Sequence, residues 1–311
     1  MNKVKYILSW VLWPFFFISC LSVTAYGFSI GWPILFFNIA YVFLFIGLYY
    51  AERFMPHEAE WMPSDGQIVP DILHTLSSKG TVQLLIYANA TIGAASLAPQ
   101  TGIGFDIWPN EWPMILQVSL AVVVSEFMLY WAHRTAHEHK FLWRFHAIHH
   151  SVTKLWVVNT GRFHFMDSLY KIILGMTPLL LMGAPMDIIK WVAVVTAIIG
   201  LMTHCNVEMR FGRLSWIFNT PELHRWHHSK DLREGDKNYG ENIVLWDILL
   251  GTYFHEDRRP PVDIGIKEPM PAQFKYQIIW PFLSKKRQAE ILAMIGEGAV
   301  IKSVWKTPYA K

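Results

Sequence analysis

The sequence predicts an all-α integral membrane protein, with about four transmembrane helices in two hairpins and a cytoplasmic helical domain that carries clustered histidines. Three observations lead to this fold class. Hydrophobic residues make up 53% of the 311 residues and charged residues only 16%, whereas a soluble domain usually carries about 25% charged residues. Residues 6–51 contain no charged residue and no histidine. In contrast, 11 of the 14 histidines lie between His133 and His228.

The uncharged stretch near the N-terminus predicts a hairpin of two membrane spans within residues 1–51. A spanning helix needs about 20 apolar residues, so the stretch suits two spans, Tyr6–Tyr26 and Trp32–Tyr50, with a break marked by Gly27, Gly31 and Pro33. A cleaved signal peptide is the alternative for the first span, because lysines precede it. A second apolar run follows at once and no clear small-residue cleavage site is present, so we expect a retained anchor.

A second hairpin is predicted within residues 80–132. The stretch Gly80–Phe105 is uncharged, with its apolar core at Val82–Ala98, and Trp112–Trp131 is apolar except for Glu126. Each stretch is long enough to cross a bilayer. We therefore expect four spans in all.

The region 133–255 contains the histidine clusters and two shorter apolar segments, Ile172–Met186 and Trp191–Val207. Both are short for full spans, so we expect a re-entrant or partly inserted hairpin. Lysines and arginines gather after the fourth predicted span, and such residues favour the cytoplasmic side of a membrane. The histidine clusters are therefore predicted to face the cytoplasm, and residues 256–311 to form a cytoplasmic tail.

The clustered histidines are spaced so that several lie on one face of a helix. The motifs HRTAH, HAIHH and HRWHH contain eight of them: His133, His137, His146, His149, His150, His224, His227 and His228. Side chains three or four positions apart on a helix are neighbours, with Cβ atoms roughly 5–6 Å apart. Imidazole suits iron, zinc, copper and nickel, and eight ligands exceed the needs of one ion. We expect two metal ions; solvated or structural histidines are the alternative.

The residues around these clusters resemble the sterol desaturase and fatty acid hydroxylase superfamily. The resemblance is carried by SEFMLYWAHRTAHEHKFLWRFHAIHHS, TPELHRWHHS and NYGENIVLWDILLGTY, within Glu126–Tyr253, about 40% of the chain. It implies a non-haem centre of two iron ions, O₂ as cosubstrate, and a lipid or sterol-like substrate that enters from the bilayer. The same kind of centre hydroxylates or desaturates, and the sequence leaves that choice open.

Two isolated histidines also match ligand positions of the superfamily. They are His164 in GRFHFMDS and His204 in LMTHCN. Phe165 stands where the superfamily often has proline after the first of them. The resemblance thus implies ten metal ligands, the eight clustered histidines with His164 and His204. The alternative for each isolated histidine is a structural role in hydrogen bonding.

Three further residues, Glu126, Tyr130 and Asp247, are candidate catalytic residues that support the ligands. Glu126, Tyr130 and His133 follow one another at i, i+4 and i+7, on one stripe of a helix. An ionisable side chain inside a span is costly and points to function. Metal-bound histidines usually donate their second N–H to a carboxylate or carbonyl. We expect Glu126 to accept from a histidine of another cluster and Asp247 or Asp167 to act similarly; an ion pair with a nearby arginine is the alternative for Glu126.

The electrons that such chemistry needs are expected from outside the chain. No fused haem-binding segment and no dinucleotide-binding fingerprint is visible, so we expect a separate ferredoxin or cytochrome b5-type donor with its reductase. The net charge of +3 gives no reason to expect nucleic acid. The alternative function is a histidine-rich membrane metal transporter or metal-storage protein. Transporters place ligands near the bilayer midplane, whereas these clusters follow the spans, which favours the enzyme.

Overall fold

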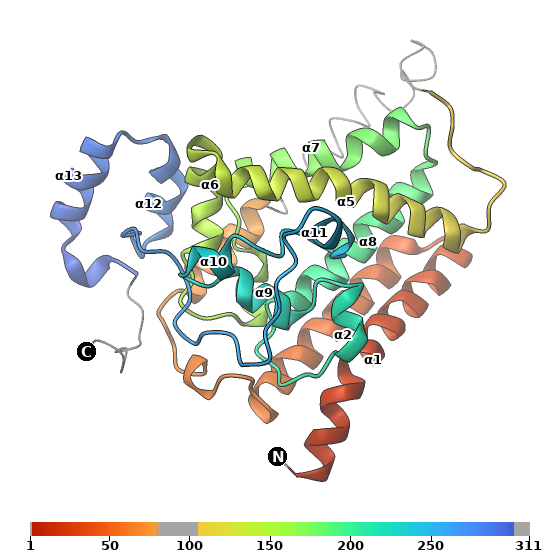
Figure 1. Ribbon diagram of the computed structural model, residues 1–311, viewed down its shortest axis with the longest axis horizontal. Helices are drawn as coiled ribbons and strands as arrows, with labels where there is room; N and C mark the ends of the chain where they lie inside the picture. Colours follow the sequence, from red (N-terminus) through yellow and green to blue (C-terminus); the bar gives the residue numbers. More distant parts are fainter. Residues whose placement is uncertain (1, 79, 81–104, 302–311) are drawn as a thin grey trace.

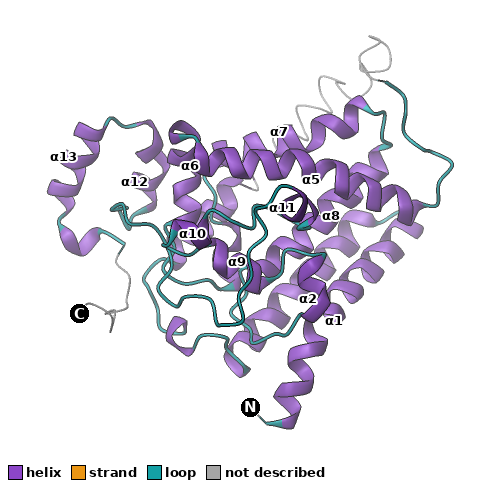
Figure 2. Ribbon diagram, viewed as in Figure 1, coloured by secondary structure: helices purple, strands orange, loops and turns teal. Residues whose placement is uncertain are grey.

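The computed structural model describes residues 2–78, 80 and 105–301, and these residues form helices joined by loops (Figures 1 and 2). Extended segments among them meet only at isolated bridges, such as the one between Pro56 and Val207. The all-α prediction is confirmed. The long helices are α1 Lys3–Ser29, α2 Pro33–Phe54, α5 Met114–Glu138, α6 Lys140–His150, α7 Phe165–Leu181, α8 Met186–Thr203 and α13 Lys285–Ile295.

Shorter helices line the loops between the long ones. They are η1 Ala59–Trp61, a helix through residues 68–78, η2 Val157–Gly161, η3 Gly212–Trp216, α9 Pro221–His227, α10 Leu232–Gly235, α11 Leu245–Leu249, α12 Phe274–Ile279, η4 Trp280–Phe282 and η5 Glu297–Ala299.

The first two helices form the predicted N-terminal hairpin. The side chain of Asn2 accepts a hydrogen bond from the Lys5 N–H at 3.0 Å and caps α1. Gly31 turns the chain with a φ of 77°, a conformation that glycine adopts without strain. Pro33 starts α2 at the first helical position, where its missing N–H costs nothing. The first predicted span lies within α1, and the second lies within α2 except for Trp32, which is the N-cap of α2.

The fourth predicted span is longer than expected. It begins at Met114 rather than Trp112 and runs to Glu138 without a break, so the first histidine cluster sits on the membrane helix itself. Its predicted hairpin partner, Gly80–Phe105, lies almost entirely outside the described residues. The flanking residues lie at opposite ends of α7: the Ser78 hydroxyl donates to the Phe163 carbonyl at 3.1 Å and the Phe105 N–H to the Leu181 carbonyl at 2.7 Å.

The hairpin expected to be only partly inserted consists of α7, with 17 residues, and α8, with 18 residues, and how far it enters the membrane stays a prediction. Four helices of the described chain are long and apolar enough to cross a membrane, namely α1, α2, α5 and α8. The turn between α7 and α8 contains Gly183, with a φ of 79°, and Pro185 precedes α8. Glycine and proline therefore shape this turn, whereas Gly175 and Pro178 are accommodated inside α7.

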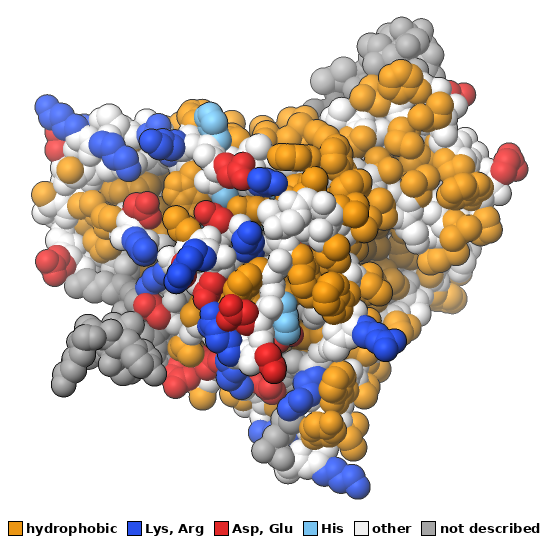
Figure 3. Space-filling view, in the orientation of Figure 1, with side chains coloured by type: hydrophobic (Ala, Val, Ile, Leu, Met, Phe, Trp, Pro, Cys, Tyr) orange, Lys and Arg blue, Asp and Glu red, His pale blue; other side chains and the backbone are white. Residues whose placement is uncertain are grey.

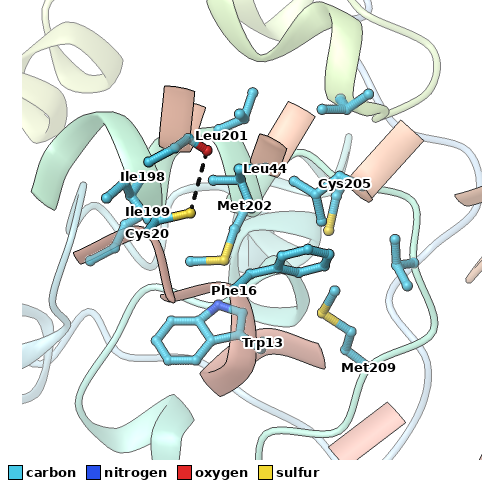
Figure 4. Close-up of a cluster of buried hydrophobic side chains, with 14 of the residues drawn as sticks. Trp13, Phe16, Cys20, Leu44, Ile198, Ile199, Leu201, Met202, Cys205 and Met209 are labelled. Atoms are coloured by element: carbon cyan, nitrogen blue, oxygen red, sulfur yellow. Dashed lines mark hydrogen bonds between the residues drawn. The ribbon is translucent and has the colours of Figure 1, made fainter. Parts of the chain in front are cut away.

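Helix α8 packs against α1, α2 and α5. Its buried face joins the largest hydrophobic cluster, where Ile198 and Met202 meet Trp13 and Phe16 of α1 and Leu44 of α2 (Figure 4). The cluster continues past the end of α8. Because this core joins the N-terminal hairpin to the segment after Thr203, it fixes the chain that leads to His204.

The helices are arranged so that the ends near the histidines lie together. The Lys5 ammonium near the start of α1 donates to the Phe54 carbonyl at the end of α2, at 2.7 Å. Arg210, which follows α8, donates from its N–H to the Ser9 carbonyl at 2.7 Å. Figure 3 shows hydrophobic side chains covering the right of the molecule and charged ones gathering on the left. Exposed apolar residues such as Ile34 and Ile115, 77% and 71% exposed, give the bundle the surface of a membrane protein.

Gly175 provides a test of the packing between α5 and α7. A Cβ atom there would lie 2.8 Å from Cδ2 of Leu129, whereas a Cβ at Gly200 in α8 would meet nothing within 4 Å. Gly175→Val should therefore destabilise the protein by about 1–3 kcal/mol more than the control Gly200→Val, because overpacking forces neighbours to move. The apparent unfolding temperature in detergent measures the difference; equal temperatures for the two variants would contradict the packing.

Candidate metal centre

Five histidines from three helices form the first group of possible ligands. His133 and His137 come from α5, His146 and His150 from α6, and His227 from α9. One ligand atom from each lies within 4.8 Å of all the others. The group therefore brings together side chains almost a hundred positions apart in the sequence.

Four histidines form the second group beside the first. His149 comes from α6, His204 follows the end of α8, and His224 and His228 belong to α9 and its C-terminal cap. Their ligand atoms also lie within 4.8 Å of one another. The rings of His150 in the first group and His228 in the second stack with centroids 4.3 Å apart, so the two groups are adjacent.

Each HxxHH motif contributes to both groups. On α6, His146 and His150 belong to the first group and His149 to the second; on α9, His227 belongs to the first and His224 to the second. Residues i and i+4 share a helical face, while the residue between them points to one side. The motif therefore contributes histidines to two neighbouring groups rather than three to one group.

Six of the nine histidines place Nδ1 near an oxygen that can accept its hydrogen. The side-chain acceptors are Asp236 for His137 at 3.1 Å, Asp167 for His146 at 3.0 Å, and Asn159 for His204 at 3.0 Å. The backbone carbonyl acceptors are those of Tyr239 for His133 at 2.8 Å, Arg162 for His149 at 3.3 Å, and Lys237 for His227 at 2.7 Å. An Nδ1–H held in this way leaves the Nε2 lone pair for a metal.

The Nε2 atoms point at one another. His150 Nε2 lies 3.1 Å from Nε2 of both His137 and His146, and His228 Nε2 lies 3.2 Å and 3.1 Å from those of His149 and His224. Ligand nitrogens around an ion at about 2.0–2.1 Å are expected roughly this far apart. The Nε2 atoms of His133, His204 and His227 are buried without a hydrogen-bond partner. Buried polar atoms without partners are costly, and ions between these nitrogens would satisfy them.

Burial keeps the histidines neutral. It lowers the pKa of His146 and of His204 to about 3. Burial and then the neighbouring histidines lower the pKa of His149, His150, His224, His227 and His228 well below the usual value. Neutral imidazole is the form that binds a metal. The donor set, its protonation and its buried unpartnered nitrogens together fit two ions that prefer nitrogen ligands, such as iron.

His164 is not brought to either group, although the resemblance implied a ligand there. Its Nδ1 accepts a hydrogen bond from the Met166 N–H at 3.2 Å and so caps α7. Its Nε2 lies 3.0 Å from the Ile278 carbonyl. Both ring nitrogens are therefore engaged in the structural role that was the alternative. His204, the other isolated histidine, does join the second group.

The loop 237–242 supports the first group. Its carbonyls at Lys237 and Tyr239 accept from His227 and His133. Asn238 adopts a φ of 54°, an uncommon conformation to which asparagine is better suited than most residues. A Cβ atom on Gly240 would lie 2.3 Å from the Ile243 carbonyl oxygen. Asn238 and Gly240 of the NYG motif therefore allow the backbone conformation of this loop.

Asp247 holds this loop rather than a histidine. Its carboxylate accepts from the N–H groups of Tyr239 and Gly240, both at 2.8 Å, and from the Thr252 hydroxyl at 2.7 Å. Tyr130, another candidate, hydrogen-bonds to Thr252 at 3.0 Å. Asp247 therefore contacts the loop that carries the acceptors, and Tyr130 contacts Thr252 beside it; neither contacts a histidine of the two groups directly through these hydrogen bonds.

Glu126 also acts on this loop. The expectation that its carboxylate accepts from a histidine is not met. It accepts instead from the N–H of Glu241, from the N–H of Asn242 at 3.1 Å and from the Asn242 amide at 2.7 Å. The residue is completely buried in α5. A carboxylate accepting several N–H groups needs no cationic partner, which explains why no arginine accompanies it.

A second buried glutamate, which the sequence analysis did not single out, supports the second group. Glu52 near the end of α2 is 1% exposed and accepts from the N–H groups of Val157 at 2.7 Å and Asn206 at 2.9 Å. Val157 begins η2, which carries the Asn159 acceptor of His204. In the sequence, Glu52 is the first charged residue after a long apolar stretch. Nothing local to that position indicates that it contacts Val157 and Asn206.

A buried lysine links the carboxylates beside the first group. Lys171 on α7 lies 2.5 Å from Glu241, whose carboxylate is 3.4 Å from His133 Nδ1. One turn earlier on α7, Asp167 lies 3.0 Å from His146 Nδ1, as the sequence suggested for this carboxylate. The lysine offsets negative charge that would otherwise be buried unpaired.

The sequence profile of the fatty acid hydroxylase family matches residues 118–252. The ornithine lipid hydroxylase OlsE of Rhizobium tropici is 48% identical over 285 residues, which cover 91% of this chain and 86% of that protein. The alkylglycerol monooxygenase of Homo sapiens is 29% identical over 178 residues, 56% of this chain and 39% of that protein. The fatty acid hydroxylase vlmA of a Lecanicillium species is 29% identical over 168 residues, 49% of this chain and 45% of that protein. No solved structure was found to match the chain.

The two buried glutamates allow a crossed test of the two groups. Glu126→Gln should weaken metal binding mainly in the first group and Glu52→Gln mainly in the second. The amide NH₂ of each new glutamine would face backbone N–H groups, from which the native carboxylate accepts hydrogen bonds. Loss of such supporting contacts typically lowers metal affinity roughly 10- to 100-fold. Mössbauer spectra of iron-loaded protein can distinguish the two ions, and each variant serves as the control for the other. Equal loss from both ions in both variants would contradict the separate roles.

Proposed function

The chain belongs to the fatty acid hydroxylase family, and we propose that it is a membrane-bound di-iron oxygenase that uses O₂ to hydroxylate a polar membrane lipid. It is an oxidoreductase of a family that modifies lipids: the relatives named above are hydroxylases and a monooxygenase. The alternative of a metal transporter or metal-storage protein is not supported, since the matched relatives are enzymes. The resemblance found in the sequence is confirmed.

The observation that carries the proposal is the pair of histidine groups at the end of apolar helices. Nine buried imidazoles offer nitrogen ligands to two adjacent ions. Iron bound there would supply the O₂-activating chemistry that an unreactive C–H bond requires. No acid or base among the described residues is needed to break such a bond, and the histidines act as ligands.

The protein residues hold and orient these ligands. Acceptors at Nδ1 fix which ring nitrogen carries the hydrogen and how each ring is turned. Asp247 and Glu126 hold the loop that bears two of the acceptors, and Glu52 holds the segments beside His204. The surrounding burial excludes water, which protects reactive species from side reactions.

We place the substrate among polar lipids of the bilayer. The ornithine lipid hydroxylase relative matches 91% of the chain, so its similarity extends well beyond the family profile at residues 118–252. An amino-acid-containing lipid related to that relative's substrate is therefore the first candidate. Such a lipid would approach the site along the apolar surface of the membrane helices.

Both the membrane topology and the electron donor belong to the proposal. Basic residues Lys3, Lys5 and Arg53 flank the spans at the histidine-bearing end. In the described segments at the opposite end, residues 30–32, 105–113 and 182–190, the last of which includes the first turn of α8, Lys190 is the basic residue. Because basic residues favour the cytoplasmic side, we place α1, α2, α5 and α8 across the membrane, with α7 carrying the chain across to the start of α8, and the site on the cytoplasmic side. A ferredoxin or cytochrome b5-type protein and its reductase would reach it there.

Lipid mass spectrometry under ¹⁸O₂ tests the function. Cells that make the ornithine-type lipid would express either the intact chain or His149→Ala, in which one ligand of the second group is removed. A lipid that gains one labelled oxygen only with the intact chain is the expected result.

The other outcomes are distinct. A lipid that loses two hydrogens without label would replace hydroxylation by desaturation. If both chains insert into the membrane equally and neither changes any lipid while a donor and reductase are supplied, the proposed function fails.

A further inference from the structure

The helices near the C-terminus present exposed apolar side chains beside the histidine-bearing end of the bundle. Ile279 at the end of α12 is 42% exposed and Phe282 on η4 is 58% exposed. Phe141 at the start of α6 is 57% exposed. Helix α6 packs on η4, and the ring of Phe145 lies 5.4 Å from that of Phe282. The three exposed side chains therefore belong to elements packed together.

Several contacts hold α12 and η4 against α6 and the start of α7. A guanidinium nitrogen of Arg144 on α6 donates to the Leu283 carbonyl, and the ring of Phe282 lies 5.7 Å from that of His164 at the start of α7. Figure 1 places α12 and α13 beyond α6, at the left, where α5 ends. The apolar side chains thus lie beside the ends of the membrane helices, where headgroups would surround the protein.

The same region is basic. Its exposed cationic side chains are Lys140, Lys275, Lys285, Lys286 and Arg287. The nearby carboxylates of Glu138 and Glu290 are paired with Arg134 at 2.7 Å and Arg287 at 2.5 Å. Figure 3 shows blue side chains beside orange ones at the upper left, over α13 and α6. The lysines therefore leave a net positive charge around the apolar side chains.

The neighbouring helix, residues 68–78, also exposes apolar side chains, and it buries polar ones. Ile72 and Leu76 are 46% and 60% exposed, while Asp71 and His74 on its other face are buried completely. His74 Nε2 lies 2.9 Å from the amide oxygen of Gln277 on α12, which joins the two elements. A soluble surface rarely exposes contiguous apolar side chains while polar ones are buried.

We propose that α12, η4 and the start of α13 lie on the cytoplasmic headgroup layer of the bilayer, as an interfacial element that binds anionic lipids. Ile279, Phe282 and Phe141 would enter the boundary between headgroups and acyl chains. Apolar side chains bordered by lysines and arginines are typical of such elements, and anionic headgroups attract the basic side chains. The segment is continuous with the lipid-facing ends of the spans, which favours lipid over a soluble partner. The cytoplasmic tail expected from the sequence would therefore rest on the membrane.

This placement bears on the metal centre. Asp71 on helix 68–78 forms a fully buried ion pair of 2.7 Å with Arg162, whose carbonyl faces His149 Nδ1. An element held on the bilayer beside this pair would keep the acceptor of one ligand in place.

Fluorescence quenching in nanodiscs tests the proposal. Phe282→Cys in the full chain would carry a bimane label; the native Cys20 and Cys205 are buried. The matched control is Leu232→Cys on α10, which is 65% exposed and lies between the charged Asp231 and Arg233. In discs of anionic lipids with brominated acyl chains, the label at 282 should lose fluorescence and resist aqueous iodide, while the label at 232 should show the reverse. Lys285→Glu with Lys286→Glu should reduce the lipid quenching at 282.

Three results would overturn it. The first is that the label at 282 is as accessible to iodide as the control label at 232. The second is that its quenching by lipid in neutral discs, and in the variant with both lysines changed, equals its quenching in anionic discs. Energy transfer between labelled chains in place of lipid quenching would instead make this face an interface between copies. If Phe282→Cys does not fold, Ile279→Cys carries the label. Lipid hydroxylation is not measured, so the test is independent of the proposed function.

Discussion

Nine imidazoles share one small buried volume, so protonating any of them is costly and each ring N–H there needs an acceptor. Burial disfavours the charged ring, and an unpaired N–H in the same place would be costly. The fold meets this requirement for six of the nine rings, with carbonyl, carboxylate and amide oxygens that extend from Asp167 on α7 to the Tyr239 loop, whereas Nδ1 of His224 and of His228 is buried without a partner. The buried polar residues at this end of the molecule make sense as the consequence of that one constraint.

The helices that are long and apolar enough to cross a membrane also take part in this arrangement. α5 carries Glu126 and two ligands on one helix, and α2 ends in Glu52, which reaches both η2 and the segment after His204. The N-terminal hairpin lies outside the segment matched by the family profile. Its packing on α8 through Phe16, Leu44 and Met202 nevertheless sets where His204 stands. The position of a histidine inside the family profile can therefore depend on helices that lie outside it.

Periodic patterns were predictable from the sequence and distant partners were not. Apolar runs located α1 and α2, and helical spacing singled out eight histidines that the structure brings into the two groups, because both signals are local. The split of each HxxHH motif between two groups depends on how α6 faces α9, which spacing cannot give. His164 and His204 are equally isolated in the sequence, yet only the one at the end of α8 reaches the centre. The carbonyl acceptors leave no side-chain signal at all, and the carboxylate of Glu126 contacts the loop at Asn242 rather than the histidine expected from the sequence.

Iron analysis combined with X-ray absorption on the purified protein tests the two-group arrangement most directly. The intact chain should bind two irons with nitrogen ligands and a short iron–iron distance. His139→Ala, which removes an exposed histidine outside both groups, should leave these features unchanged, and His227→Ala should disturb the iron of the five-histidine group. A single iron per chain, or the same spectrum after His227→Ala as before it, would contradict the account.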